Sequence, residues 1–140
     1  MKIKKVVVIG SGTMGSGIAA HLCNANIPVT LLDLKTEISK LAREKIYKSK
    51  PPLLLDKSKI ENIKVGNILE DFSEVAEADW VVEAVVERID IKHDIYEKIF
   101  KERKKGAIVS SNTSSIPIKI LSQNLSEVEK KDFCITHFFN

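Results

Sequence analysis

The chain carries a glycine-rich hexapeptide where an apolar run gives way to a segment with helical periodicity. We expect Gly10 to turn the chain sharply off a strand, Gly12 to let backbone approach a pyrophosphate, and Gly15 to let helix and strand pack closely. Free N–H groups at the start of the helix then face the anion. The pattern predicts a dinucleotide site whose phosphate-binding residues are Gly10, Ser11, Gly12, Thr13, Met14 and Gly15.

A carboxylate follows this loop at the separation expected for a ribose ligand. Asp33 ends a second apolar run and lies about twenty residues after the first glycine. Its oxygens can accept both ribose hydroxyls of an adenosine, and its charge would repel a 2′-phosphate. The nearby Lys35 does not remove that repulsion. The cofactor predicted from these residues is therefore NAD rather than NADP.

Strand and helix patterns alternate along the chain, which is typical of parallel βαβ units. Pro51 and Pro52 end the second helical segment. We predict one α/β domain over residues 1–140, with a Rossmann-type, doubly wound and mostly parallel sheet flanked by helices. Strands are expected at 6–9, 29–32, 63–65, 80–86, 107–111 and 133–136, and helices after the first at 37–47, 89–100 and 117–121.

Polar residues follow several predicted strands, at the ends where an open parallel sheet gathers its ligands. Glu83 and Glu87 accompany the fourth strand, and a run rich in serine follows the fifth. His137 and Asn140 follow the sixth. Because the carboxyl ends of parallel strands meet at one edge of a sheet, we expect these residues to converge.

Each of these residues also has a structural interpretation. On spacing alone, His137 beside two phenylalanines is typical of a core histidine, and Ser114 and Ser115 are typical helix caps. Glu87 suits the first turn of a helix, where the dipole favours an acid, and a lysine such as Lys92 is usually solvated. The residue types by themselves leave both interpretations open.

The order of four motifs resembles that of the NAD-dependent L-3-hydroxyacyl-CoA dehydrogenases. The motifs are the glycine loop, Val-Glu-Ala-Val-Val-Glu at 82–87, Ser-Asn-Thr-Ser-Ser at 111–115 and His-Phe-Phe-Asn at 137–140. The resemblance spans the whole chain, and the last two motifs are far more specific than the glycines. It implies oxidation of the 3-hydroxyl of a fatty acyl-CoA thioester in fatty-acid β-oxidation, with hydride passing from C3 to NAD.

The resemblance also implies roles for individual residues. His137 would be the general base, since an imidazole takes and returns a proton near neutral pH. Ser114 would hydrogen-bond the substrate oxygen beside the nicotinamide, and Asn140 would hold the nicotinamide side of the site. Glu87 and Lys92 match positions that the family uses around the cofactor.

The family has further parts that these residues do not include. A second, mostly helical domain closes over the acyl-CoA substrate and forms a homodimer, and a glutamate beyond the histidine orients it. We therefore expect residues 1–140 to be the NAD-binding domain of a longer enzyme, with very weak or no activity alone. Two alternatives stay open: a non-catalytic NAD(H)-binding or regulatory module, and a dehydrogenase of another 3-hydroxy acid, such as a sugar acid.

Composition limits the possible partners. The net charge of +3 is too small to argue for nucleic acid, and no apolar run is long enough to cross a bilayer. Because the first strand begins almost at once, we expect a cytoplasmic protein without a signal peptide. Basic residues cluster in 35–64, which is typical of a solvated helical face or of a docking surface for a phosphate-bearing substrate. Cys23 and Cys134 are expected to be buried free thiols, with no metal site.

Overall fold

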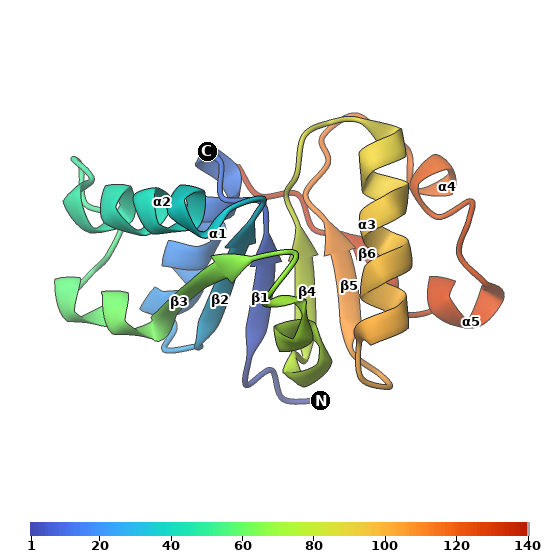
Figure 1. Cartoon of the computed structure of the whole chain (residues 1–140), viewed down its shortest axis with the longest axis horizontal. Coiled ribbons are helices and arrows are strands. Elements are labelled where there is room, and N and C mark those ends of the chain that lie inside the picture. The colour runs from blue at the N-terminus through green and yellow to red at the C-terminus, as the bar shows by residue number, and fades with distance from the viewer. Residues whose placement is uncertain (140) are drawn as a thin grey trace.

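A parallel sheet forms the middle layer of the molecule, and helices cover both of its faces (Figure 1). The computed structural model describes residues 1–139. Its six strands follow the order β3-β2-β1-β4-β5-β6, and every neighbouring pair is parallel. This order confirms the Rossmann-type fold. The strands are β1 (Val6–Ile9), β2 (Val29–Asp33), β3 (Ile63–Asn67), β4 (Trp80–Glu83), β5 (Ile108–Ser111) and β6 (Phe133–Ile135).

The helices connect successive strands, and α1 and α2 pack on one face of the sheet while α3 and α4 pack on the other. The α-helices are α1 (Thr13–Asn24), α2 (Thr36–Lys48), α3 (Ile89–Glu102), α4 (Ile118–Leu121) and α5 (Glu127–Lys130). Two 3₁₀ helices, η1 (Lys57–Asn62) and η2 (Phe72–Glu77), lie before and after β3. Sequence patterns did not predict η1 or η2, because helices of six residues are too short to show a hydrophobic period. No helix within residues 1–139 is long and apolar enough to span a membrane.

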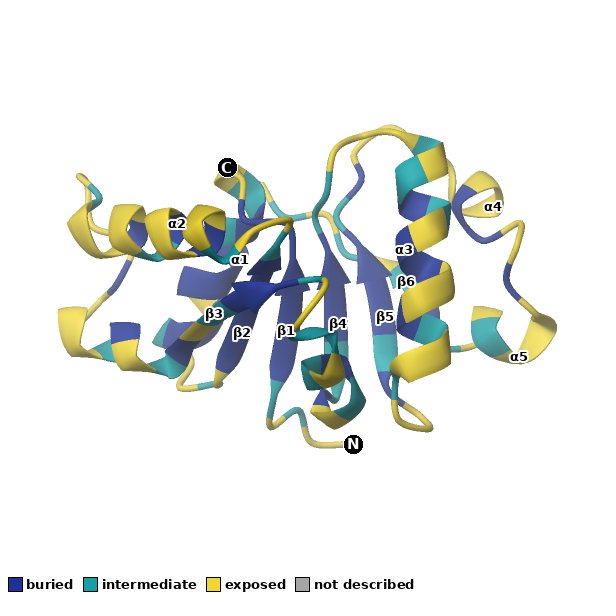
Figure 2. Cartoon of the chain, viewed as in Figure 1, coloured by how far each residue is buried: buried dark blue, intermediate teal, exposed yellow. Residues whose placement is uncertain are grey.

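The strands are apolar on both sides because both faces of the sheet are covered. In β1, Val6 and Val8 enter a core that includes residues of α1 and α2, whereas Val7 and Ile9 enter a core that includes residues of α3. Figure 2 shows the buried strands between helices whose outer surfaces are exposed. This packing fixes the directions in which α1 and α3 leave the sheet.

Two sequence predictions need correction. The fourth strand ends at Glu83 rather than at residue 86, because Glu83 pairs with Ile9 and β1 ends there. Residues 84–88 then form a loop at the carboxyl edge of the sheet. Cys23 is fully buried as predicted, but Cys134 is only half-buried because it lies on the edge strand β6; both are free thiols.

Candidate functional site

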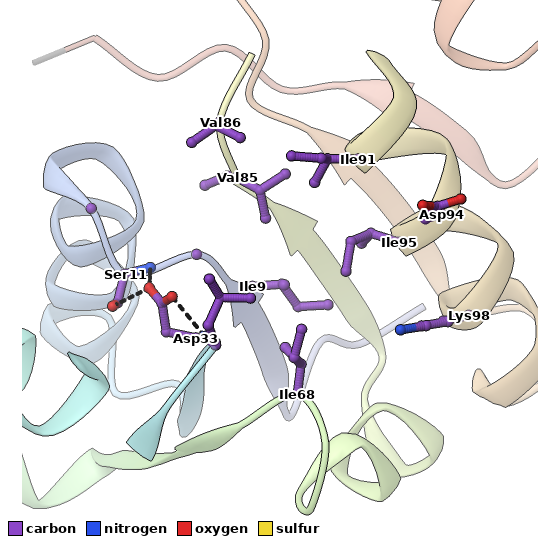
Figure 3. Close-up of a pocket in the computed structure, with 14 residues that line it drawn as sticks. Ile9, Ser11, Asp33, Ile68, Val85, Val86, Ile91, Asp94, Ile95 and Lys98 are labelled. Carbon is purple, nitrogen blue, oxygen red and sulfur yellow. Dashed lines mark hydrogen bonds between the residues drawn. The ribbon is translucent and has the colours of Figure 1, made fainter. Parts of the chain in front are cut away.

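A crevice opens at the carboxyl edge of the sheet, between the adjacent strands β1 and β4. The chain leaves β1 toward one face of the sheet and β4 toward the other, which makes this the topological switch point where doubly wound folds bind ligands. The crevice holds a cavity of about 460 Å³. Its lining comes from the glycine loop, the end of β2, the loop after β4 and one face of α3 (Figure 3).

Two glycines of the loop are required by close backbone contacts. Gly10 has φ +101°, and a Cβ there would lie 2.4 Å from the carbonyl oxygen of Ala84. A Cβ on Gly15 would lie 1.7 Å from the carbonyl oxygen of Gly10. A Cβ on Gly12, by contrast, would meet nothing within 4 Å. The protein therefore leaves open the space beside Gly12, as the approach of a pyrophosphate to the start of α1 requires.

The start of α1 has the character of an anion site. Gly12 is its N-cap and provides no side-chain hydrogen bond, and no acidic residue lies in the first turn. The first N–H groups of the helix are thus not satisfied by a capping side chain. Ser11 lines the main cavity, whereas Thr13 and Met14 line a second cavity of about 340 Å³ beside Phe138.

Asp33 lies at the edge of the main cavity and is tied to the glycine loop. Its Oδ2 accepts hydrogen bonds from the backbone N–H of Ser11 at 2.8 Å and from the Ser11 hydroxyl at 2.5 Å (Figure 3). Its Oδ1 accepts one from the backbone N–H of Leu34 at 2.7 Å. Because each carboxylate oxygen can accept more than one hydrogen bond, Asp33 keeps capacity for a ligand hydroxyl.

Apolar side chains also line this cavity, and the sequence analysis did not identify them as residues of the site. Leu34 is 65% exposed and Val86 is 60% exposed, although both are large and apolar. With Ile68 and Ile91 they line the same cavity as Asp33. An exposed apolar slot beside a ribose-binding carboxylate suits a flat aromatic base. The sequence did contain a signal for these residues, because Leu34 directly follows Asp33 and Val86 lies in the loop after β4.

A buried group of charges lies under the same edge of the sheet. Lys92 of α3 is 1% exposed and Glu83 of β4 is fully buried, so the alternative interpretation of Lys92 as a solvated lysine is wrong. The Lys92 Nζ lies 2.7 Å from Glu83 Oε1 and 2.9 Å from Glu87 Oε1. Burial and the neighbouring Glu83 charge raise the pKa of Tyr96, whose hydroxyl donates to Glu83 Oε2 at 2.7 Å.

Glu87 connects this charge group to the loop after β5. Its Oε2 accepts hydrogen bonds from the hydroxyls of Thr113 at 2.7 Å and Ser115 at 3.1 Å. Although partial burial opposes ionisation, the hydrogen bonds from Lys92 and Thr113 hold the pKa of Glu87 below its usual value. Glu87 and Lys92 thus form an ion pair, but neither lines the cavity beside Asp33. Their contact with a cofactor stays a prediction.

Ser114 is exposed at the tip of this loop. The structure contradicts the helix-cap interpretation of Ser114 and Ser115, because α4 begins only at Ile118 and its N-cap residue gives no side-chain hydrogen bond. Thr113 instead stabilises the bend at residues 114–116, since its Oγ1 accepts from the backbone N–H of Ser115 at 3.4 Å and of Ile116 at 3.1 Å. The Ser114 hydroxyl has no partner among residues 1–139.

His137 is exposed, so the core-histidine interpretation is wrong. Its Nδ1 lies 3.4 Å from the carbonyl oxygen of Asn112, and the Asn112 side chain accepts from the backbone N–H of Phe138 at 2.9 Å. The loop that carries Ser114 therefore also holds the His137 segment. Within residues 1–139 no carboxylate is hydrogen-bonded to the imidazole. Asn140 lies outside the described residues.

The basic segment 35–64 uses several of its cations for structure. Arg43 donates to the carbonyl oxygens of Ile63 and Ile60, and Lys64 pairs with Glu74. Lys59 donates to Asn26 at 2.7 Å. These contacts account for part of the local positive charge, while the docking surface for a phosphate-bearing substrate stays a prediction.

Comparison with known proteins gives one family. Residues 5–140 match the family described as 3-hydroxyacyl-CoA dehydrogenase, NAD binding domain. A probable 3-hydroxyacyl-CoA dehydrogenase of Deinococcus radiodurans is 43% identical over all of this chain, which spans 42% of that relative. A putative fatty acid oxidation complex trifunctional enzyme of Rickettsia felis is 45% identical over 99% of the chain, which spans 20% of it. The chain thus covers less than half of either relative.

Solved structures agree on the fold and differ in substrate. The 3-hydroxybutyryl-CoA dehydrogenase of Escherichia coli K12 superposes on the whole chain with a TM-score of 0.86 at 26% identity, and the chain covers 30% of it. A 5-formyl-3-hydroxy-2-methylpyridine 4-carboxylic acid 5-dehydrogenase, described as an NAD⁺-dependent dismutase, superposes over 99% of the chain with a TM-score of 0.82 at 28% identity, and the chain covers 45% of it. The substrate named for the second enzyme is not a CoA thioester.

Proposed function

The chain belongs to the NAD-binding domain family of the 3-hydroxyacyl-CoA dehydrogenases, and we propose that the whole protein oxidises (3S)-3-hydroxyacyl-CoA to 3-ketoacyl-CoA. The observation that carries the proposal is the contact of the His137 segment with the loop that carries Ser114, through Asn112. This contact brings the segment of His137 and the loop of Ser114 together after β6 and β5, at the edge of the sheet where doubly wound folds bind their ligands.

The crevice residues fit NAD in charge and shape. The open space at Gly12 and the uncapped start of α1 accommodate a pyrophosphate. Asp33 offers carboxylate oxygens to the adenosine ribose, and its charge opposes a 2′-phosphate. The apolar slot of Leu34, Ile68 and Val86 covers the adenine. When bound, NAD supplies the acceptor for the hydride that leaves C3 of the substrate.

The two candidate catalytic residues have complementary tasks. The exposed His137 imidazole takes the proton of the substrate 3-hydroxyl as the C3–H bond breaks, and returns it in the reverse direction. The Ser114 hydroxyl donates a hydrogen bond to the same oxygen and stabilises the negative charge that develops there. Asn140, Glu87 and Lys92 are proposed to surround the nicotinamide half of the cofactor.

The remaining parts of the enzyme lie outside residues 1–140. We propose that a helical C-terminal domain binds the acyl-CoA, forms the homodimer and supplies the carboxylate that orients His137. The isolated 140-residue chain is then expected to bind NADH with little turnover, because most substrate contacts and the partner of the imidazolium are missing. A cytoplasmic location and the dimer are tested on the full-length protein by cell fractionation and light scattering.

The test is the reduction of acetoacetyl-CoA by NADH in the full-length protein and in its His137→Ala variant. We expect turnover by the wild type and a loss of about a hundredfold or more in the variant, as for a missing general base. NADH affinity should be the same in both proteins. Equal turnover in the two proteins would contradict the role of His137, and NADH binding without any turnover by the wild type would favour a non-catalytic module.

A dehydrogenase of another 3-hydroxy acid is a second candidate, because the dehydrogenase of the formylpyridine carboxylic acid shares this fold closely and its named substrate carries no CoA. Free acetoacetate discriminates between the two candidates, since it carries the same reacting carbonyl without CoA. A clear preference for acetoacetyl-CoA supports the proposed function. Equal rates with both compounds would favour the second candidate.

A further inference from the structure

The buried charges under the carboxyl edge of the sheet are connected to the exposed residues of the candidate site. We propose that Glu83, Lys92 and Glu87 are positioning residues that hold the loop of Ser114 and, through it, the His137 segment. We call these three residues the charge chain. The inference rests on the proposed function, because it assigns the charge chain a task in the reaction of that site.

Glu83 is the fixed end of the charge chain. It is fully buried, and both of its oxygens are used. Oε1 accepts from Lys92 Nζ at 2.7 Å and from the backbone N–H of Val85 at 2.9 Å. Oε2 accepts from the hydroxyls of Tyr96 at 2.7 Å and Ser111 at 2.6 Å. Donors from the loop after β4, from α3 and from β5 converge on it, so each oxygen of this carboxylate is held by two hydrogen bonds.

Lys92 connects the Glu83 carboxylate to Glu87. Its ammonium lies between the two carboxylates and is 1% exposed, so the lysine cannot follow Glu87 into solvent. A buried ion pair is a costly way to gain stability, since apolar residues of the same size often stabilise a core as well. Such pairs are better explained by the specific arrangement they impose, which here is the position of Glu87.

Glu87 in turn holds the loop on both sides of Ser114. Its Oε2 accepts from the hydroxyls of Thr113 and Ser115, the two neighbours of Ser114 in the sequence. Thr113 Oγ1 also accepts from the backbone N–H groups of Ser115 and Ile116. The Ser114 side chain takes part in none of these bonds and is exposed. The charge chain thus fixes the backbone of Ser114 and leaves its hydroxyl available to a substrate.

The other end of the loop is held in the same way and reaches the histidine. Ser111 donates to Glu83 and accepts from the backbone N–H of Thr113 at 3.2 Å. Asn112, between these two residues, binds the backbone of Phe138 and lies next to His137. Because one loop holds both candidate catalytic side chains, a shift of the loop displaces the proton acceptor and the hydrogen-bond donor together.

Such a shift should lower kcat more than it weakens cofactor binding. Misplacement of reacting groups by about 1 Å can cost roughly a hundredfold in rate. The adenosine half of the cofactor, by contrast, contacts the crevice near Asp33, and neither Thr113 nor Ser115 lines that cavity. A positioning role therefore predicts a fall in kcat that is larger than any rise in the dissociation constant for NADH.

Thr113 gives the sharpest test, because valine keeps its shape and removes its hydroxyl, whereas serine keeps the hydroxyl. In the full-length protein we expect Thr113→Val to lower kcat about tenfold or more, with KM for acetoacetyl-CoA and Kd for NADH within about twofold of wild type. Thr113→Ser should retain most of the wild-type kcat. Thr30→Val is the matched control, since Thr30 is buried in β2 and its hydroxyl makes only a 3.4 Å contact with Glu74.

Several outcomes would overturn the proposal. One is a wild-type kcat in Thr113→Val. Another is an equal fall in kcat in Thr113→Val and Thr113→Ser. A third is a loss of NADH affinity in Thr113→Val that accounts for its whole fall in activity. If Thr113→Val does not fold, Ser115→Ala removes the other hydroxyl on Glu87, and an unchanged kcat overturns the proposal equally. If the wild type does not reduce acetoacetyl-CoA, the proposed function fails on its own. Amide hydrogen exchange of residues 113–116 then tests the positioning role without turnover. We expect faster exchange in Thr113→Val than in Thr113→Ser, and equal exchange in the two variants overturns the positioning role.

Discussion

Replacing Lys92 with methionine removes the cation from the buried charge chain and leaves a chain of similar length. Glu83 is fully buried and would lose its only charged donor among residues 1–139. Breaking a buried pair by removing one partner costs about 3–5 kcal/mol, because the remaining charge stays desolvated. Glu83 keeps the hydroxyls of Tyr96 and Ser111 and the Val85 N–H, so we expect a value near the lower end, about 3 kcal/mol.

Urea unfolding measures this loss directly. Trp80, the single tryptophan, lies at the start of β4 and reports unfolding by fluorescence. Lys130→Met is the matched control, because Lys130 makes an exposed pair with Glu127 and its removal should cost less than about 1 kcal/mol. In the double variant Glu83→Gln with Lys92→Met, the uncompensated charge is gone, so part of the lost stability should return. A cost for Lys92→Met no larger than that for Lys130→Met would refute the reasoning.

Three further predictions concern the crevice and the acid stability of the domain. Asp33→Ala should weaken NADH binding roughly tenfold or more and relax the rejection of NADPH, as calorimetric titration with both would show. Gly12→Ala should keep the wild-type melting temperature but lose NADH affinity, whereas Gly15→Ala should lower the melting temperature because its Cβ would lie 1.7 Å from a backbone oxygen. Hydrogen bonds from Lys5 and Lys64 lower the pKa of Glu74 to about 2. The contribution of Glu74 to stability should therefore be lost as the pH falls from the ordinary pKa of a glutamate toward about 2. Glu74→Gln should flatten that decline in urea unfolding, and an unchanged pH profile would exclude this contribution.

The parts of the fold that depend on local pattern were predictable from sequence. Val6–Ile9 followed by the glycine loop predicts β1 and α1, and the apolar run before Asp33 predicts β2. The crevice between β1 and β4 follows from the parallel topology that this alternation implies. Its Gly10 turn and Asp33 edge therefore lie where the sequence indicated.

The parts that depend on contacts between distant residues were not predictable in this way. Lys92 has the spacing of a surface lysine, and only Glu83, on another element, explains its burial. Thr113 does not stand out from its serine neighbours, although its hydroxyl alone among them both donates to Glu87 and accepts two backbone N–H groups. The exposed positions of Leu34 and Val86 likewise follow from where β2 and β4 end.

The crevice between β1 and β4 is proposed to bind NAD, with Asp33 on the adenosine ribose. Calorimetric titration of the 140-residue chain with NADH and with NADPH measures this binding. We expect NADH to bind at one site and NADPH to bind at least about tenfold more weakly, because its 2′-phosphate meets the Asp33 carboxylate. Binding of NADPH as tight as that of NADH, or no binding of either by a folded chain, would contradict this proposal.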